Sequence, residues 1–209
     1  ARNNLWRAVA YACHPDAWGV QIVFDNQVIL GTRARKTRTK SFNAFSSIDY
    51  PETAMFRDRR LIQFLQRPAE YTHAVFSTAL DPNVFVLRLV PGMRADIIPM
   101  LEGRYRALVL ESFGVGGLPG GDDGAMFAAV RDWCGAGHLA VFTTQVPHEG
   151  SDLAVYEVGR AAKALPGVLE AHDMTPEATA VKLMWVLGQT TDRAEAEKLF
   201  LTPVQWDIL

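Results

Sequence analysis

The sequence predicts an α/β fold built around a parallel sheet, and two observations support this class. From Val84 onward, short runs of branched apolar residues alternate with segments of helical periodicity. Such alternation is typical of a parallel sheet with crossover helices. The chain of 209 residues is also 49% hydrophobic and 21% charged, which is ordinary for a globular protein with a large core. No apolar run approaches the roughly 18 residues needed to cross a membrane, so we expect no membrane partner.

The first 50 residues predict a helix and a hairpin. Asn3 or Asn4 caps the helix, which ends at His14 and Pro15. Its apolar positions share one face and are Leu5, Ala8, Val9 and Ala12. Residues 20–31 form the hairpin, because two apolar runs flank Asp25-Asn26, a dipeptide that tolerates the positive φ of a two-residue turn.

In the second half, strands and helices are expected to alternate. Residues 52–83 lack clear periodicity and predict a connection between domains. Beyond it, the predicted strands are 84–89, 107–110 and 138–143, and the predicted helices are 95–101, 122–134, 153–163, 175–187 and 191–200. The helix at 175–187 has the clearest start, because Thr175 suits a cap and Pro176 the first helical position. We expect Lys182 to be a surface or interface charge.

The strand at 107–110 ends in a polar, glycine-rich loop. Glu111 and Ser112 follow it, and then come Phe113 and three glycines, which are Gly114, Gly116 and Gly117. Ligands bind at the carboxyl ends of the strands in open parallel sheets, and glycine lets backbone N–H groups approach a ligand closely. A tight strand-to-helix connection without a ligand accounts for the glycines equally well.

Charge, cysteine and histidine usage exclude several classes of partner. The formal charge of −2 and the pI of about 6.2 give no field that would gather nucleic acid or anionic lipid. Cys13 and Cys134 each lie beside large apolar residues and predict two buried thiols in a reducing compartment. The five histidines have no spacing typical of a zinc site, so we expect no metal.

One segment, residues 31–40, is strongly basic, and its cations are Arg33, Arg35, Lys36, Arg38 and Lys40. Cationic groups close to a lysine amine disfavour its charged form and make it a better proton acceptor. If the segment is a strand, the two nearest arginines on its N-terminal side point away from Lys36 and the effect shrinks. A solvated edge strand or an anion-binding patch is the alternative.

Five motifs stand out in the chain, and in order they are NNLWRAVAYA, VILGTRARKTRTKSFNAFSS, LVLESFGVGGLP, FTTQVPHEGSDLAVYEVGRA and HDMTPEATAVKLMWVLG. Together they resemble the bacterial cytoplasmic (type I) L-asparaginases. The resemblance covers nearly the whole chain. It implies an enzyme that hydrolyses L-asparagine to L-aspartate and ammonia without a cofactor, located in the cytoplasm and assembled as a homo-dimer or tetramer.

The resemblance also implies a domain organisation. Residues 1–50 correspond to the C-terminal part of the family's N-terminal α/β domain, 51–83 to an interdomain linker, and 84–209 to the complete C-terminal domain, with helices on both faces of its sheet. The family's TGGTI-like and GTDT-like segments hold the nucleophilic threonine and a threonine-aspartate pair, and neither occurs here. We therefore expect this chain to be inactive alone and to need the missing N-terminal segment as a partner.

Site residues follow from the same resemblance. Lys36 matches the lysine of the catalytic threonine-aspartate-lysine group. Tyr156 matches a residue that reaches into the neighbouring subunit's site, although a helix packing face is the alternative. Some relatives bind asparagine as an activator through an arginine, an asparagine and a cysteine where this chain has Glu111, Gly117 and Val146. These differences argue against such activation.

Glu111, Ser112 and Gly117 therefore remain effector-site or interface candidates. Two other functions stay open beside that of an asparaginase. The first is a non-catalytic amino-acid-binding or assembly domain derived from an asparaginase. The second is the subunit of an amidotransferase that deamidates an amino acid for a tRNA-linked product, which would be expected to carry an extra domain.

Overall fold

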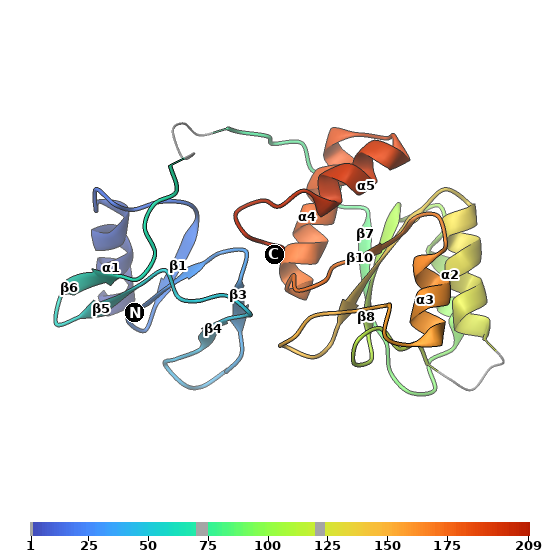
Figure 1. Cartoon of the computed structure of the whole chain (residues 1–209), viewed down its shortest axis with the longest axis horizontal. Coiled ribbons are helices and arrows are strands. Elements are labelled where there is room, and N and C mark those ends of the chain that lie inside the picture. Colours follow the sequence, from blue (N-terminus) through green and yellow to red (C-terminus); the bar gives the residue numbers. More distant parts are fainter. Residues whose placement is uncertain (1, 70–74, 120–123) are drawn as a thin grey trace. The chain divides into compact units, whose positions relative to one another are not determined.

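The computed structural model describes residues 2–69, 75–119 and 124–209. The chain forms two compact units, Ala1–Ser77 and Thr78–Leu209 (Figure 1). In its described parts, no helix is long and apolar enough to cross a membrane.

The first unit is an antiparallel sheet with one helix. The helix, α1 (Arg2–Ala12), contacts strand β1 of a sheet whose order is β1-β2-β5-β6. Its strands are β1 (Gln21–Phe24), β2 (Gln27–Leu30), β5 (Ala54–Arg57) and β6 (Arg60–Gln63). The predicted hairpin is confirmed: β1 pairs with β2, and Asp25 and Asn26 form the turn with φ of 45° and 72°. A separate ribbon pairs β3 (Ala34–Lys36) with β4 (Phe45–Ser47).

Three expectations for this unit need correction. Asn3 or Asn4 was predicted to cap the first helix, but α1 begins at Arg2 and both residues lie inside it. Of the predicted apolar stripe, Leu5 and Val9 are 70% and 54% exposed, and Tyr11 is the buried residue of α1. Helical periodicity identifies an apolar stripe, but it does not say which side of the helix meets the sheet.

Residues 54–63 lie within the predicted linker, yet they form β5 and β6 of the sheet. Each of these strands has four residues, the lower limit for an alternating pattern, and no turn dipeptide of the Asp25-Asn26 kind lies between them.

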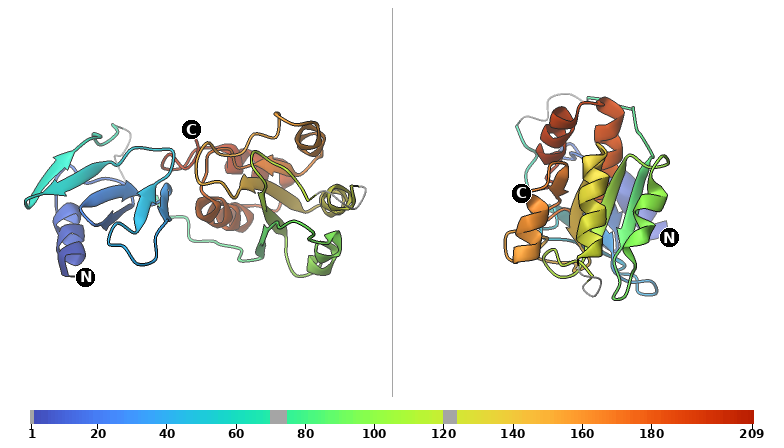
Figure 2. Two further views of the ribbon diagram at one scale, coloured as in Figure 1. Left: turned by 90° about the horizontal axis from the view of Figure 1, so that it is seen from below. Right: turned by 90° about the vertical axis from the view of Figure 1, so that its right-hand side faces the viewer.

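The second unit confirms the predicted α/β fold. Four parallel strands have the order β10-β9-β8-β7. They are β7 (Val84–Arg88), β8 (Ala107–Ser112), β9 (Leu139–Thr144) and β10 (Val168–Glu170). Figures 1 and 2 show α2 (Ala125–Gly135) and α3 (Glu157–Lys163) on one face of this sheet, and α4 (Pro176–Gln189) and α5 (Arg193–Leu201) on the other.

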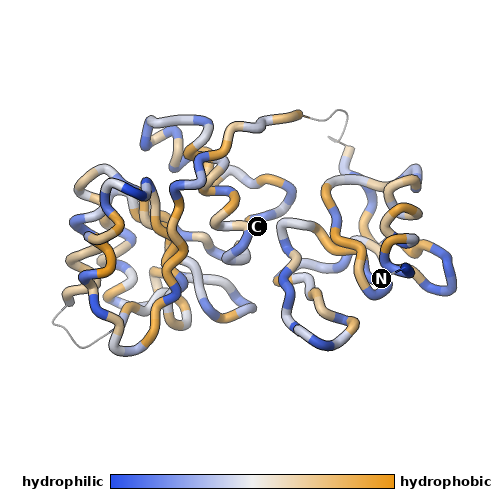
Figure 3. The backbone as a smooth tube through the Cα atoms, turned by 180° about the vertical axis from the view of Figure 1, so that it is seen from behind, coloured by the Kyte–Doolittle hydropathy of each residue, from blue (hydrophilic) through white to orange (hydrophobic). Residues whose placement is uncertain are grey.

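Alternation along the strands divides the apolar side chains between two cores. Val109 and Val141 pack on the face covered by α4 and α5, with Leu183, Val186 and Phe200. The opposite core contains Leu108, Phe142, Val130, Trp133 and Ala162, from the sheet, α2 and α3. The strands accordingly form hydrophobic segments inside the unit (Figure 3). Because both faces are covered, β8 and β9 need apolar residues at consecutive positions.

Differences from the prediction in this unit are local. Residues 95–101 form two short 3-10 turns, η1 (Ala95–Ile97) and η2 (Pro99–Leu101), because Pro99 lacks the N–H that a continuous helix needs. The predicted start of the next helix at Asp122 lies outside the described residues. Strand β10 was missed, since three residues are too few to show a pattern.

The two cysteines differ in environment. Cys134 is buried, as predicted, and burial raises the pKa of its thiol to about 11. The same prediction is wrong for Cys13, which is exposed just after α1. The predicted cap of α4 is confirmed, because Thr175 Oγ1 accepts a hydrogen bond from the N–H of Ala178 at 3.1 Å.

Lys182 was expected to be a surface or interface charge, but it lies in α4 and is buried inside the second unit. Its Nζ lies 2.8 Å from Asp207 Oδ2 and donates to the carbonyl of Thr202 at 2.8 Å. The side chains of the pair are only 5% and 4% exposed. Desolvation lowers the pKa of Lys182, against the opposing effect of Asp207. The pair therefore fastens the C-terminal segment to α4.

We predict that Lys182→Met destabilises the second unit by about 3 kcal/mol, because Asp207 remains buried without its cation. Combining it with Asp207→Asn removes both charges, keeps an acceptor for the N–H of Val204, and should restore at least half of the loss. Urea denaturation followed by circular dichroism at about 222 nm measures both changes through the helical signal. A single variant within about 1 kcal/mol of wild type would mean that the pair contributes little.

Candidate functional site

Polar groups gather at the carboxyl ends of β7, β8 and β9. The Nε2 of Gln145 donates to the carbonyls of Leu89 and Glu111, at 2.6 and 2.8 Å. The Oγ of Ser112 donates to the carbonyl of Thr143 at 2.7 Å. Because Ser112 is fully buried, this hydrogen bond joins two strands and leaves the hydroxyl no surface for a ligand.

Glu111 lies at the same edge but on the other face of the sheet. Its carboxylate pairs with Arg88 of the neighbouring strand, with a distance of 3.2 Å between Nη1 and Oε2. The Glu111 side chain is 12% exposed and that of Arg88 is 58% exposed. The two residues therefore present a neutralised pair, and the arginine is the more accessible partner.

The glycine loop after β8 is folded on itself. The N–H groups of Gly116 and Gly117 both donate to the carbonyl of Phe113, at 3.0 and 2.7 Å. Gly114 and Gly116 have positive φ, of 50° and 150°. At Gly116 a Cβ atom would clash with Cδ2 of Leu153, 2.4 Å away. These glycines thus allow a tight turn and close packing. This favours a tight connection after β8 over a loop whose backbone N–H groups bind a ligand.

A cavity of about 290 Å³ lies between this loop and the segment that leads into α3. Its lining residues are Val115, Gly116, Gly117, Leu118, Asp152, Leu153, Tyr156, Val158 and Gly159. The structure therefore brings two of the predicted residues, Gly117 and Tyr156, to one cavity. Tyr156 is 63% exposed and directly precedes α3. Val155, just before it, and Val158, in the first turn of α3, are about half exposed, at 49% and 52%. The surface around the cavity is mainly apolar.

Several residues that shape this cavity were not found from the sequence. Leu153 is buried beneath Gly116, and Gly159 is so close to Leu153 that a Cβ atom would lie 2.4 Å from the Leu153 carbonyl oxygen. A glycine within a predicted helix was the available signal, because glycine there usually has a packing reason.

Lys36 belongs to the first unit, at the end of β3, and is exposed. It pairs with Phe45 of β4. The arginines near it in sequence have contacts of their own. Arg33 is fully buried, with its guanidinium 5.7 Å from the centre of the Tyr50 ring, and Arg38 donates to the carbonyl of Asn43 at 3.1 Å. The alternative for this basic segment was a solvated edge strand or an anion-binding patch. The exposed place of Lys36 in a two-stranded ribbon agrees with the first of these.

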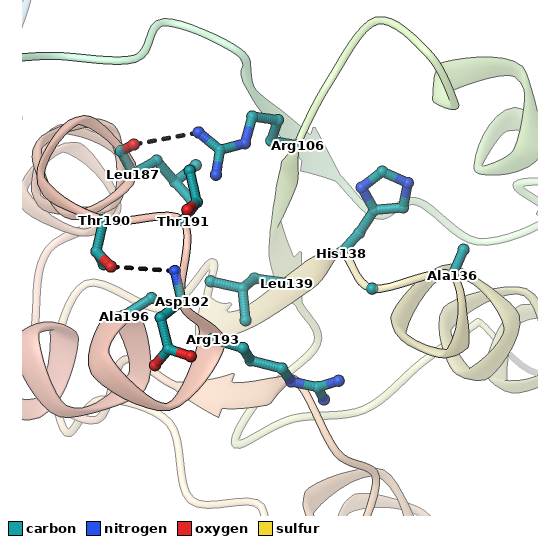
Figure 4. Close-up of a pocket in the computed structure, with 11 residues that line it drawn as sticks. Arg106, Ala136, His138, Leu139, Leu187, Thr190, Thr191, Asp192, Arg193 and Ala196 are labelled. Atoms are coloured by element: carbon teal, nitrogen blue, oxygen red, sulfur yellow. Dashed lines mark hydrogen bonds between the residues drawn. The ribbon is translucent and has the colours of Figure 1, made fainter.

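A second cavity, of about 250 Å³, lies beside the amino ends of β8 and β9 (Figure 4). Arg106 and Arg193 both line it, but their guanidinium groups point apart. Nη1 of Arg106 donates to Asp81 at 2.7 Å and to the carbonyl of Leu187 at 3.1 Å, and Arg193 pairs with Glu197 at 3.2 Å. Arg106 therefore joins the start of the unit to the end of α4, which is a structural role.

No group of three or more histidine, cysteine or acidic side chains that would hold a metal ion occurs among the residues that the structure describes. Within the same residues, the cavity next to Tyr156 is the place where candidates from the sequence meet. Its apolar lining suits packing or substrate enclosure better than proton transfer.

Comparison with known families matches both units in order. The profile of the family "Asparaginase, N-terminal" matches residues 1–70, and that of the "Glutaminase/Asparaginase C-terminal domain" matches residues 83–200. An L-asparaginase of Thermococcus kodakarensis is 38% identical over 200 residues, covering 95% of this chain and 60% of the relative. A glutamyl-tRNA(Gln) amidotransferase subunit of Metallosphaera sedula is 33% identical over 178 residues, covering 82% of this chain and 39% of the relative.

Solved structures have the same fold. The thermostable L-asparaginase from Thermococcus kodakarensis superposes with a TM-score of 0.90 at 34% identity, over 99% of this chain and 62% of that one. L-asparaginase I from Vibrio cholerae gives a TM-score of 0.82 at 23% identity, over 100% of this chain and 63% of that one. The chain thus spans about 60% of the length of the first of these relatives.

The contact at Gly159 generates a test with a matched control. We predict that Gly159→Ala destabilises the second unit by about 2 kcal/mol, because its Cβ would meet the backbone of Leu153. Gly135→Ala, also in a helix but with no atom within 4 Å of the new Cβ, should be neutral or stabilising by about 0.5 kcal/mol. Urea denaturation compares the two, and equal effects would contradict the packing role of Gly159.

Proposed function

This chain belongs to the asparaginase family, and we propose that it forms part of an L-asparaginase that hydrolyses L-asparagine to L-aspartate and ammonia. The observation that carries the proposal is the 38% identity with an L-asparaginase over 95% of the chain. Matches to both family domains, in the order expected for one enzyme, support it.

The proposed reaction uses a threonine nucleophile that this chain does not contain. The hydroxyl attacks the side-chain amide carbonyl of asparagine, backbone N–H groups stabilise the oxyanion, ammonia leaves, and water opens the acyl-enzyme. We propose that Lys36 supports proton transfer at the nucleophile. Its exposed place at the end of β3 leaves the amine accessible to groups supplied by a further segment of the protein. No metal or redox cofactor is needed for these steps.

Tyr156 is proposed as a contact to substrate or to a neighbouring subunit. Its large exposed fraction and its position at the mouth of an apolar cavity support that role over helix packing within one chain. Glu111, Ser112 and Gly117 are proposed for an effector region or subunit contact. Gly117 lines the same cavity as Tyr156, whereas the buried Ser112 would act only by fixing the end of its strand. Among these three residues, Glu111 is the best placed for a polar contact, because its ion-pair partner Arg88 is exposed.

We further propose that the intact protein resembles the type I enzymes in being cytoplasmic and in forming a homo-dimer or tetramer. The predicted division into 1–50 and 84–209 is kept for the two domains. The connection predicted at 51–83 is proposed to start only after β6, because β5 and β6 belong to the first compact unit.

A second candidate function is that of an amidotransferase subunit. The 33% identity with a glutamyl-tRNA(Gln) amidotransferase subunit favours it, and it retains amide hydrolysis as the chemistry. The need for a second substrate distinguishes the two functions, because an asparaginase releases ammonia from free asparagine without a tRNA-linked acceptor. A non-catalytic binding or assembly domain would release none in any context.

We predict that Lys36→Met lowers kcat for asparagine hydrolysis by at least about 100-fold in the protein expressed from its complete coding region, a range typical of lost proton transfer. Lys40→Met, four residues along the same exposed segment, is the matched control and should stay within about twofold. Ammonia release from asparagine and from glutamine is the measurement. An effect of Lys36→Met below tenfold, about 1.4 kcal/mol, would contradict its catalytic role.

The same assay tests the chain alone, which we expect to be inactive with both amides. Ammonia release by the isolated 209-residue chain at the rate of the complete protein would overturn the proposal that the nucleophile lies outside it. Release from glutamine only in the presence of a tRNA-linked acceptor would instead support the amidotransferase subunit.

A further inference from the structure

We propose that Glu170 is a positioning residue that holds the backbone of Leu153 and, through it, the segment that carries Tyr156 beside the cavity. The inference concerns the placement of this segment. It rests on the proposed function only where it extends to substrate binding, because that step requires Tyr156 to act in the substrate site.

Glu170 is a buried carboxylate at the end of β10, with 4% of its side chain exposed. Its Oε1 accepts a hydrogen bond from the backbone N–H of Leu153 at 2.6 Å. Its Oε2 lies 2.9 Å from Nζ of Lys163 in α3, and 3.9 Å from Nδ1 of His172. Both carboxylate oxygens are therefore engaged, one by a loop backbone and the other by side chains.

The position of Glu170 in the sheet sets the direction of these contacts. Glu170 is the register partner of Phe142, so both side chains lie on the same face, which α2 and α3 cover. Leu153 and Ala162 belong to the core on that face. A carboxylate there loses its hydration, and the Leu153 N–H and the Lys163 ammonium replace that hydration.

Leu153 is held on three sides. Its N–H is bound by Glu170, its side chain packs under Gly116, and its carbonyl abuts Gly159 in the first turn of α3. Cβ atoms at either glycine would approach within 2.4 Å of Leu153. Leu153 is only 1% exposed, so it is the buried point through which the loop after β8, the end of β10 and α3 are fixed to one another.

Tyr156 follows three residues after Leu153 along a segment with further local bonds. The N–H of Asp152 donates to the carbonyl of Val115 at 2.8 Å, which ties the segment to the glycine loop. The N–H of Arg160 donates to the carbonyl of Tyr156 at 2.9 Å, and the Arg160 guanidinium donates to the carbonyl of Ala154 at 3.0 Å. Fixing Leu153 therefore fixes where α3 begins and where the Tyr156 side chain leaves the backbone.

The two contacts of Glu170 are separable by substitution. Glu170→Gln keeps an oxygen that accepts from the Leu153 N–H but removes the charge that pairs with Lys163. Glu170→Leu removes both contacts at similar volume. When the carboxylate is lost in either variant, the Lys163 ammonium is hydrated, because its side chain is 48% exposed. Neither variant therefore leaves an unpaired buried charge at Lys163.

Hydrogen exchange of backbone amides in the 209-residue chain, read by mass spectrometry, tests the proposal. Glu170→Leu should speed exchange in the segment 152–158 by at least about tenfold, since the opening that exposes these amides loses its main restraint. Glu170→Gln should stay within about threefold of wild type, because it keeps the acceptor. Exchange in β8 and β9, which lie in the core, should be unchanged in both variants and serves as the internal control.

The proposal is overturned if Glu170→Leu leaves segment 152–158 within about threefold of wild type, or if Glu170→Gln speeds exchange as much as Glu170→Leu. Should circular dichroism show that Glu170→Leu does not fold, Glu170→Thr replaces it, because a threonine suits a strand and its hydroxyl is too short to take the place of the carboxylate. The same thresholds then apply.

An activity measurement separates this inference from the proposed function. In the complete protein, Glu170→Leu and Tyr156→Ala should each raise KM for asparagine at least about fivefold, with kcat within about threefold, while Glu170→Gln should leave KM within about twofold. Faster exchange together with an unchanged KM in both variants would support the positioning of the segment and contradict the role of Tyr156 in the substrate site.

Discussion

Burial of β8 and β9 on both faces is the constraint from which the second unit follows. Every residue of β9 is buried, and every residue of β8 except Glu111. Strands of this kind need a helical layer on each side, because an uncovered face would leave large apolar areas in water. Helices α2 and α3 form one layer, and α4 and α5 form the other. Polar chemistry is thereby confined to the strand ends and loops.

At the carboxyl edge, polar groups in the described segments are used largely to hold loops together. Ser112 and Gln145 bond to main-chain carbonyls across the strands, and Glu170 bonds to the main chain of the loop before α3. Glycines complete this arrangement by allowing contacts that any side chain would block. The edge is thus organised by side chain to backbone bonds. That explains how an exposed residue such as Tyr156 keeps a defined place, since its backbone is fixed by its neighbours.

The sequence predicted those features that depend on local chemistry or on long patterns. Asp25-Asn26 indicated a hairpin because few residues adopt positive φ in succession, and Thr175-Pro176 indicated a helix start. Alternation of apolar runs was enough for the fold class of the second unit. Strands β10 and β5 were missed because three or four residues give at most two repeats of the two-residue alternation, and, unlike β1 and β2, they had no recognised turn dipeptide beside them.

Contacts between residues distant in sequence were also beyond sequence reasoning. In the sequence, Lys182 resembles an exposed charge on a helix. Only the folded structure shows that it pairs with Asp207 of the C-terminal segment. Glu170 gives no sign of its role, because its partner at Leu153 is a backbone N–H that every residue except proline has. Tyr156 and Gly117 were proposed separately from a resemblance, and only the folded loops place them at one cavity. For buried polar groups, tertiary structure decides whether a charge is solvated or paired.

The two units differ in what they offer to an amide hydrolysis. The cavity in the second unit is lined mainly by apolar residues and glycine, and its flanking acid, Asp152, is tied into the loop by accepting from the N–H of Ala154 at 2.9 Å. Such a surface can enclose a substrate, whereas proton transfer needs a titratable group held at the reacting atom. Lys36 in the first unit is titratable, but its long, flexible side chain is exposed. The proposed proton-transfer role of Lys36 therefore requires a contact that orients its amine, because an unrestrained side chain is seldom at the reacting atom.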